Sequence, residues 1–109
     1  MKCVAEVQAG VCGFTTRIAA ESPEEEMVTF AIETDCQKIG GLAEALQGRQ
    51  FDAYDEIHKG FEGEVMQAVR GSLSGCCAGC AVPVGVFKAM QVAARLALPK
   101  DLSITLRTE

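Results

Sequence analysis

The sequence predicts an α+β fold, in which helices pack on one face of a small antiparallel sheet. Three runs near the N-terminus alternate apolar and polar residues, as half-buried strands do. Apolar residues at helical spacing follow, and one more alternating run closes the chain. Strands first and helices later are typical of α+β proteins. The predicted order is β-β-β-α-α-α-β.

The three N-terminal strands are predicted at residues 2–9, 14–20 and 27–34. Residues 10–13 carry two glycines and break the chain between the first two strands. The acidic, proline-containing stretch 21–26 is a polar turn. The second and third strands therefore form an antiparallel hairpin.

A helix is predicted directly after the third strand. Asp35 is placed to cap its start through the carboxylate, and Gly48 stands where a C-terminal glycine cap belongs. Cys36 would lie in the first turn, where free backbone N–H groups and the helix dipole stabilise a thiolate. The apolar stripe of this helix consists of Ile39, Leu42, Ala43 and Leu46.

Residues 50–73 are predicted to form a helical region of two short helices joined near Gly60. The longest helix begins at Pro83, which suits a first turn, and runs to about Leu98. It is rich in alanine, so it can pack closely against a sheet or a second copy, which would allow a homodimer. The alternating residues 102–107 predict a closing strand.

Length and composition predict one globular domain, residues 1–109. The net charge is −5 and the ten Lys and Arg residues are scattered, which excludes the basic face of a nucleic-acid binder. We expect no membrane association, because no apolar run approaches the roughly 18 residues needed to span a bilayer. The N-terminus lacks the apolar core of a targeting peptide, so we expect a cytoplasmic protein.

Six cysteines are present without a secretion signal. Thiols stay reduced in the cytosol, where such clusters bind metal or carry out redox chemistry more often than they form structural disulfides. His58 is the only histidine, so a metal site would be rich in thiolates. Soft thiolates select zinc or iron–sulfur clusters.

The predicted hairpin brings the thiols together. The start of its first strand and the end of its second lie at one end of the sheet, so Cys12 and Cys36 become neighbours there. Cys77 and Cys80 form a CxxC pair whose spacing suits two ligands of one metal. The predicted ligands are therefore Cys12, Cys36, Cys77 and Cys80. Cys76 is an alternative ligand, and Cys3 is predicted to be a small buried residue of the first strand.

This arrangement resembles the iron–sulfur cluster assembly scaffolds of the NifU/IscU type over roughly residues 10–98. Cys12-Gly13 is similar to the first cysteine motif of that family, Cys36 to the second and Cys80 to the third. Phe14 stands where the family has a functional aspartate, and Gly79 where it has a histidine. The resemblance implies an IscU/NifU-N-like fold and a pocket for a cluster or zinc.

Three hypotheses follow. The first is a binding protein that carries an iron–sulfur cluster for storage, delivery or electron transfer, with an assembly or redox protein as its partner. The second is structural zinc on the same four thiolates. The third is a thiol redox enzyme using Cys77 and Cys80. Thioredoxin-like CxxC motifs follow a strand, and residues 61–75 do not have a strand pattern, so we expect no enzyme.

Overall fold

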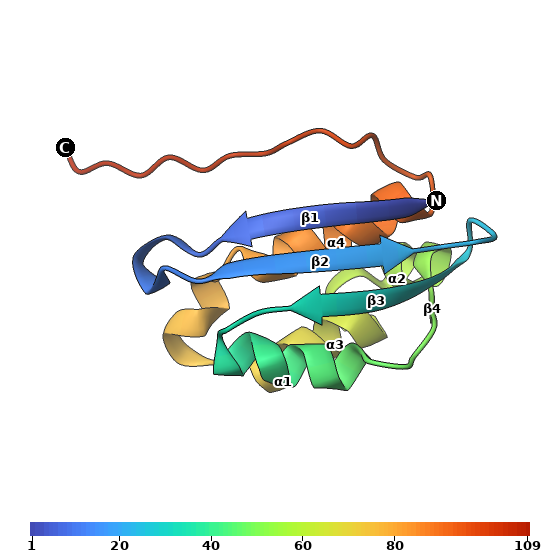
Figure 1. The fold of residues 1–109 in the computed structure, drawn as a ribbon, viewed down its shortest axis with the longest axis horizontal. Coiled ribbons are helices and arrows are strands. Elements are labelled where there is room, and N and C mark those ends of the chain that lie inside the picture. Colours follow the sequence, from blue (N-terminus) through green and yellow to red (C-terminus); the bar gives the residue numbers. More distant parts are fainter.

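The computed structural model describes all residues, Met1–Glu109, and has helices covering one face of an antiparallel sheet (Figure 1). The strands are β1 (Lys2–Gln8), β2 (Thr15–Glu21), β3 (Met27–Glu33) and β4 (Phe51–Asp52). They lie in the order β1-β2-β3-β4, and every neighbouring pair is antiparallel. The α+β fold class and the hairpin of β2 and β3 are confirmed. Strand β4 was not predicted, because two residues show no periodicity.

The helices are α1 (Gln37–Leu46), α2 (Ala53–Lys59), α3 (Glu64–Ser72) and α4 (Val82–Ala93). Helix α4 packs against β1 and β2, whereas α1 packs against β3 and α3. The break between the two short helices α2 and α3 lies near Gly60, as predicted.

Three short 3₁₀ helices connect these elements. They are η1 (Gly10–Cys12), η2 (Gly60–Glu62) and η3 (Gly75–Gly79). The first joins β1 to β2, the second joins α2 to α3, and the third lies between α3 and α4. Five of the six cysteines lie in η1, in η3 or at the start of a helix, outside the strands.

The predicted end of the longest helix, at about Leu98, is wrong. Helix α4 ends at Ala93, and Arg95 follows it with a left-handed backbone (φ 62°). The N–H of Leu96 donates to the carbonyl of Gln91 at 2.8 Å, which satisfies one of the last free carbonyls of the helix. The backbone turn therefore stops the helix before Pro99 is reached.

The predicted closing strand at residues 102–107 is also wrong. The C-terminal segment 98–109 is extended and runs beside β1, but it makes no backbone hydrogen bond to that strand (Figure 1). A space of about 700 Å³, lined by β1, α4 and residues 98–104, separates the two. The period-two pattern is present, but a strand also needs a partner within hydrogen-bonding distance. The predicted order β-β-β-α-α-α-β therefore differs from the observed one in three ways: it lacks β4, it has three helices where the structure has four, and it ends in a strand that does not form.

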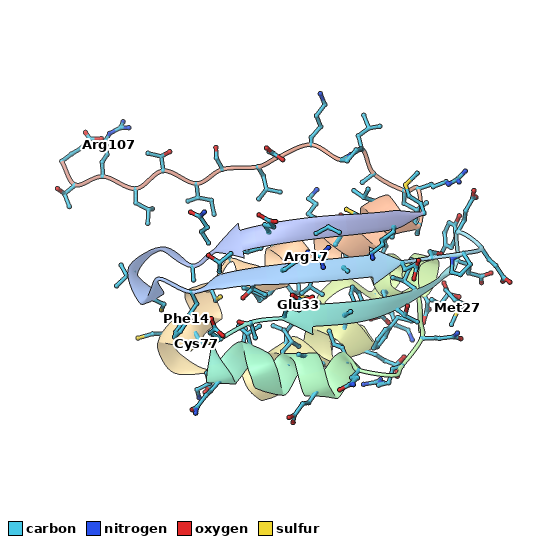
Figure 2. All side chains as sticks on the ribbon, viewed as in Figure 1. Phe14, Arg17, Met27, Glu33, Cys77 and Arg107 are labelled. Carbon is cyan, nitrogen blue, oxygen red and sulfur yellow. The ribbon has the colours of Figure 1, made fainter.

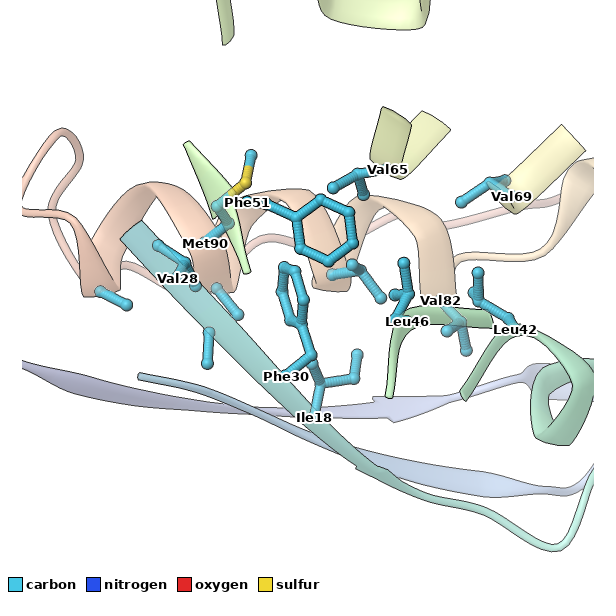
Figure 3. Packing of buried hydrophobic residues seen from close by; sticks show 14 of the residues in the cluster. Ile18, Val28, Phe30, Leu42, Leu46, Phe51, Val65, Val69, Val82 and Met90 are labelled. Atoms are coloured by element: carbon cyan, nitrogen blue, oxygen red, sulfur yellow. The ribbon is translucent and has the colours of Figure 1, made fainter. Parts of the chain in front are cut away.

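One hydrophobic cluster lies between the sheet and the helices (Figure 3). Phe30 of β3 and Phe51 of β4 pack with their ring centroids 5.7 Å apart and their planes tilted by 57°. Leu42 and Leu46 of α1 are buried in the same cluster, as is Met90 of α4. Strand β4, although short, therefore anchors the chain between α1 and α2 to the core.

One helical stretch, Gly75–Ala93, is long and apolar enough to cross a bilayer, with 19 residues and a mean hydropathy of 1.5. The expectation that no apolar run approaches this length was wrong. In the structure the stretch comprises η3 and α4, and Val82, Val86 and Met90 of α4 are buried in the core. About 39% of the apolar window is buried inside the fold, and part of the rest lines an open surface of α4.

Helix α4 approaches the sheet most closely at Gly85. A Cβ atom placed there would lie 2.6 Å from Cγ2 of Val7 and 3.2 Å from Cδ1 of Ile18. Only a residue without a side chain allows this contact, so Gly85 sets the distance between α4 and the β1–β2 pair.

We expect Gly85→Ala to destabilise the protein by about 1–3 kcal/mol, because the added methyl group overpacks the contact with Val7. Gly41→Ala in α1 is the matched control, since nothing lies within 4 Å of a Cβ at that position. The control should be neutral or slightly stabilising. Urea unfolding of both variants measures the difference, and equal stability would contradict the close contact.

Glu56 is a buried carboxylate that caps another helix. It is 2% exposed, and it accepts hydrogen bonds from the backbone N–H groups of Glu64 (3.2 Å) and Val65 (2.6 Å) at the start of α3. These N–H groups have no partner within the helix. Gly63 is buried against this carboxylate, and a Cβ there would lie 3.0 Å from Glu56 Oε1.

Glu56→Ala should therefore cost roughly 1.5–3 kcal/mol of unfolding free energy, since it leaves the buried N–H of Val65 and the part-buried N–H of Glu64 without their acceptor. Glu56→Gln keeps an acceptor oxygen and should lose clearly less. Chemical denaturation of the two variants tests this order. If both lose the same stability, the side-chain oxygens do not act as the cap.

Candidate functional site

The segments that carry five of the six thiols meet at one end of the sheet. The turn η1 follows β1, and the junction of β3 with α1 lies at the same end because β2 and β3 are antiparallel. The 3₁₀ helix η3 lies at this end too, on the left of Figure 1. Figure 2 shows Phe14, at the start of β2, and Cys77 of η3 at this end. All three segments lie at the same end of the sheet, as the predicted hairpin implies. We call it the thiol end.

Cys12 is exposed in η1. Gly10 (φ 73°) and Gly13 (φ 75°) flank it with left-handed backbones, and the N–H of Gly13 donates to the carbonyl of Gly10 at 2.9 Å. Glycine adopts this backbone without strain, which explains why both flanking positions are glycine. The turn therefore presents the thiol of Cys12 to solvent.

Cys36 is the N-terminal cap residue of α1 and is half-buried. Its N–H donates to Thr34 Oγ1 at 3.1 Å, and this oxygen lies 2.9 Å from the hydroxyl of Thr16 on β2. The predicted capping by Asp35 is wrong, since no side chain caps α1. The two threonines instead fix Cys36 relative to the start of β2, close in sequence to Cys12.

Cys76, Cys77 and Cys80 belong to η3 and its end. Cys76 is exposed, whereas Cys77 and Cys80 are half-buried against the hydrophobic core. The sulfur of Cys80 accepts a hydrogen bond from the N–H of Val82, the first residue of α4, at 3.5 Å. A backbone donor at a helix start stabilises a thiolate.

Cys3 lies away from this end, near the start of β1, where it pairs with Ala20 and packs against the core. Burial raises the pKa of the Cys3 thiol above its ordinary value. The predicted structural role of this cysteine agrees with its half-buried place in the strand. It is the one thiol that the fold separates from the others.

The structure brings the thiol-bearing segments to one end, but it does not gather the four predicted ligands around one point. No group of three or more His, Cys, Asp or Glu side chains is close enough to hold a metal ion. All six cysteines are free thiols. His58 is exposed on α2, as expected for a surface residue. The thiol groups have the chemistry that a soft metal requires. It remains a prediction that one site is formed by Cys12, Cys36, Cys77 and Cys80.

An apolar cleft of about 510 Å³ lies beside Cys77 and Cys80, which line it. Its walls come from η2, α3, η3 and the side of α4 that faces away from β1 and β2. Sequence reasoning missed this cleft. The available signal was that Val84 and Phe87 add apolar side chains to α4 beyond those that pack on the sheet, which indicates a second apolar contact. Among its lining residues are Phe61, Met66, Val69, Leu73, Val84 and Phe87.

Comparison with known proteins gives a single finding. A family model described as a family of unknown function (DUF6951) matches residues 3–106, which include both the thiol end and most of the C-terminal segment. No curated protein and no solved structure matches the chain. The chain therefore belongs to the DUF6951 family.

Proposed function

We propose that this protein binds an iron–sulfur cluster at the thiol end, through Cys12, Cys36, Cys77 and Cys80, with Cys76 as an alternative ligand. The observation that carries the proposal is the position of five free thiols on three segments that meet at one end of the sheet. Packing alone does not explain this gathering, because Cys12 and Cys76 are exposed and bury nothing.

The surroundings of the thiols support a ligand role. The N–H of Val82 already donates to the Cys80 sulfur, and hydrogen bonds to sulfur tune the potential of a cluster. The hydroxyl groups of Thr16 and Thr34 hold the backbone of Cys36 in place. When bound, the cluster would supply electron-transfer or cluster-delivery chemistry. The resemblance of Cys12-Gly13, Cys36 and Cys80 to the cysteine motifs of the NifU/IscU scaffolds is a prediction from the sequence, and the proposal extends it.

Closure of the site requires movement of η1 and η3, since no three ligands converge without it. Both segments are short and include glycines with left-handed backbones, Gly10 in η1 and Gly75 in η3. Neither segment has a side-chain cap at its start. Cys36 is held by its threonine contacts, so it is the fixed ligand toward which the other two segments move.

Structural zinc on the same thiolates is the alternative. A redox role for Cys77 and Cys80 is less favoured, because the motif follows helix α3 and η3 rather than a strand. The proposal includes a reducing, cytoplasmic location, no enzymatic activity of its own, and a partner protein that supplies or receives the cluster. A homodimer through its alanine-rich helix is part of the same hypothesis.

We expect anaerobically purified or reconstituted protein to contain iron and acid-labile sulfide, with visible absorption. Cys36→Ala and Cys80→Ala should each lose most of this content, since each removes one ligand. Cys3→Ala is the matched control and should keep it, because Cys3 lies outside the thiol end. Elemental analysis and optical spectra measure these contents.

One zinc per chain in place of iron and sulfide, lost in the same two variants, would establish the zinc alternative. Protein that takes up neither metal after anaerobic reconstitution contradicts the proposal. Equal loss in Cys3→Ala would mean that the variants act through folding rather than through ligation.

Thiol labelling gives a second test. In metal-free protein, iodoacetamide should modify the exposed Cys12 and Cys76 fastest and Cys3 slowest, because the raised pKa of Cys3 keeps it protonated. Cluster loading should protect Cys12 and leave the rate at Cys3 unchanged. Mass spectrometry of timed samples measures both modification rates. If Cys12 reacts equally fast in cluster-loaded and metal-free protein, Cys12 is not a ligand.

A further inference from the structure

The apolar cleft between α3, η3 and α4 has the features of a small-molecule site, and it borders the thiol end at Cys77 and Cys80. Its volume of about 510 Å³ falls within the roughly 300–1,000 Å³ of ligand pockets. Nine of its 14 lining residues are hydrophobic. Phe61 and Val84, both in its lining, are 73% and 43% exposed, so apolar surface remains open to a ligand.

The charge of the lining is opposite to that of the molecule. Arg70 and Lys88 line the cleft, and no Asp or Glu does, although the chain has a net charge of −5. Lys88 lies at the edge of the cleft and also lines the space beside β1, together with Glu6 and Asp101. Lys88 forms no ion pair, and Arg70 pairs only with the exposed Glu62, at 3.6 Å. The lining therefore favours a ligand with an anionic group.

A buried polar atom in the lining also lacks a partner. Oε1 of Gln91 is buried and makes no hydrogen bond. Such an atom is costly unless a ligand or water pairs with it. The oxygen itself is buried, so a ligand in the cleft reaches the Gln91 amide only after the side chain rotates, when the NH₂ group can donate to a carboxylate.

Val84, Lys88 and Gln91 follow one another along one side of α4. The rise of an α-helix gives roughly 10 Å between Val84 and Gln91. The cleft is thus elongated, with the thiols of Cys77 and Cys80 near the start of α4 and the Gln91 amide one to two turns beyond Val84.

From these observations we infer that the cleft between α3, η3 and α4 binds a small aliphatic monocarboxylate, with its chain on Phe61, Val84 and Phe87 and its carboxylate paired with Lys88. This inference goes beyond the proposed cluster site and does not depend on it, although Cys77 and Cys80 border both.

Octanoate is a suitable probe, added to the reduced full-length chain without metal and followed by NMR. The methyl signals of Met66, Val69 and Val84 should shift in a saturable way, while those of Val4 and Ile104, outside the cleft, should not. Octan-1-ol, the uncharged match, should bind several-fold more weakly. Lys88→Glu should weaken octanoate binding roughly five- to tenfold, and Lys38→Glu, the same charge change on α1, less than about twofold.

Absence of saturable shifts overturns the inference, as does equal binding of octanoate and octan-1-ol or an equal effect of the two lysine variants. Binding to anionic vesicles without binding to free octanoate would identify a membrane-facing surface and also overturn it. Metal content is measured on separate samples. Protein that binds octanoate but takes up no cluster would contradict the cluster proposal alone. Protein that takes up a cluster but does not bind octanoate would contradict this inference alone.

Discussion

The close approach of α4 to the sheet at Gly85 is the contact on which the rest of the arrangement depends. Because Val7 and Ile18 leave no room for a Cβ, α4 lies directly on β1 and β2. This contact sets the distance between α4 and the sheet, and Cys80 and η3 directly precede α4 in the chain. It also turns the opposite side of α4 outward, where α3 and η2 complete the cleft.

The hairpin of β2 and β3 could be predicted from local sequence, and so could the end of the sheet at which Cys12 and Cys36 lie. Period-two alternation sets the inner face of each strand, and the polar turn 21–26 requires antiparallel pairing. The left-handed backbone at Gly48, after α1, likewise agrees with the predicted glycine cap. These features depend on neighbouring residues, which is why sequence patterns capture them.

The features that failed depend on contacts between distant residues. Asp35 has the chemistry of a helix cap, but Thr34 is held in place by Thr16 of the neighbouring strand and bonds the N–H of Cys36 instead. Residues 102–107 have the alternation of a strand, but no periodicity reveals whether a partner lies within hydrogen-bonding distance. The cleft was missed for the same reason, because its walls come from four separate segments.

The unpaired C-terminal segment has a consequence for how this molecule behaves in concentrated solution. A free strand edge offers its backbone groups to any other chain, and natural proteins usually shield such edges. Along β1 the segment 98–109 stands beside the edge without bonding to it, and the strand itself carries the charged Lys2 and Glu6. That segment also carries exposed Leu102, Ile104 and Leu106. The edge of β1 and the C-terminal segment therefore offer backbone groups and apolar side chains to a neighbouring chain.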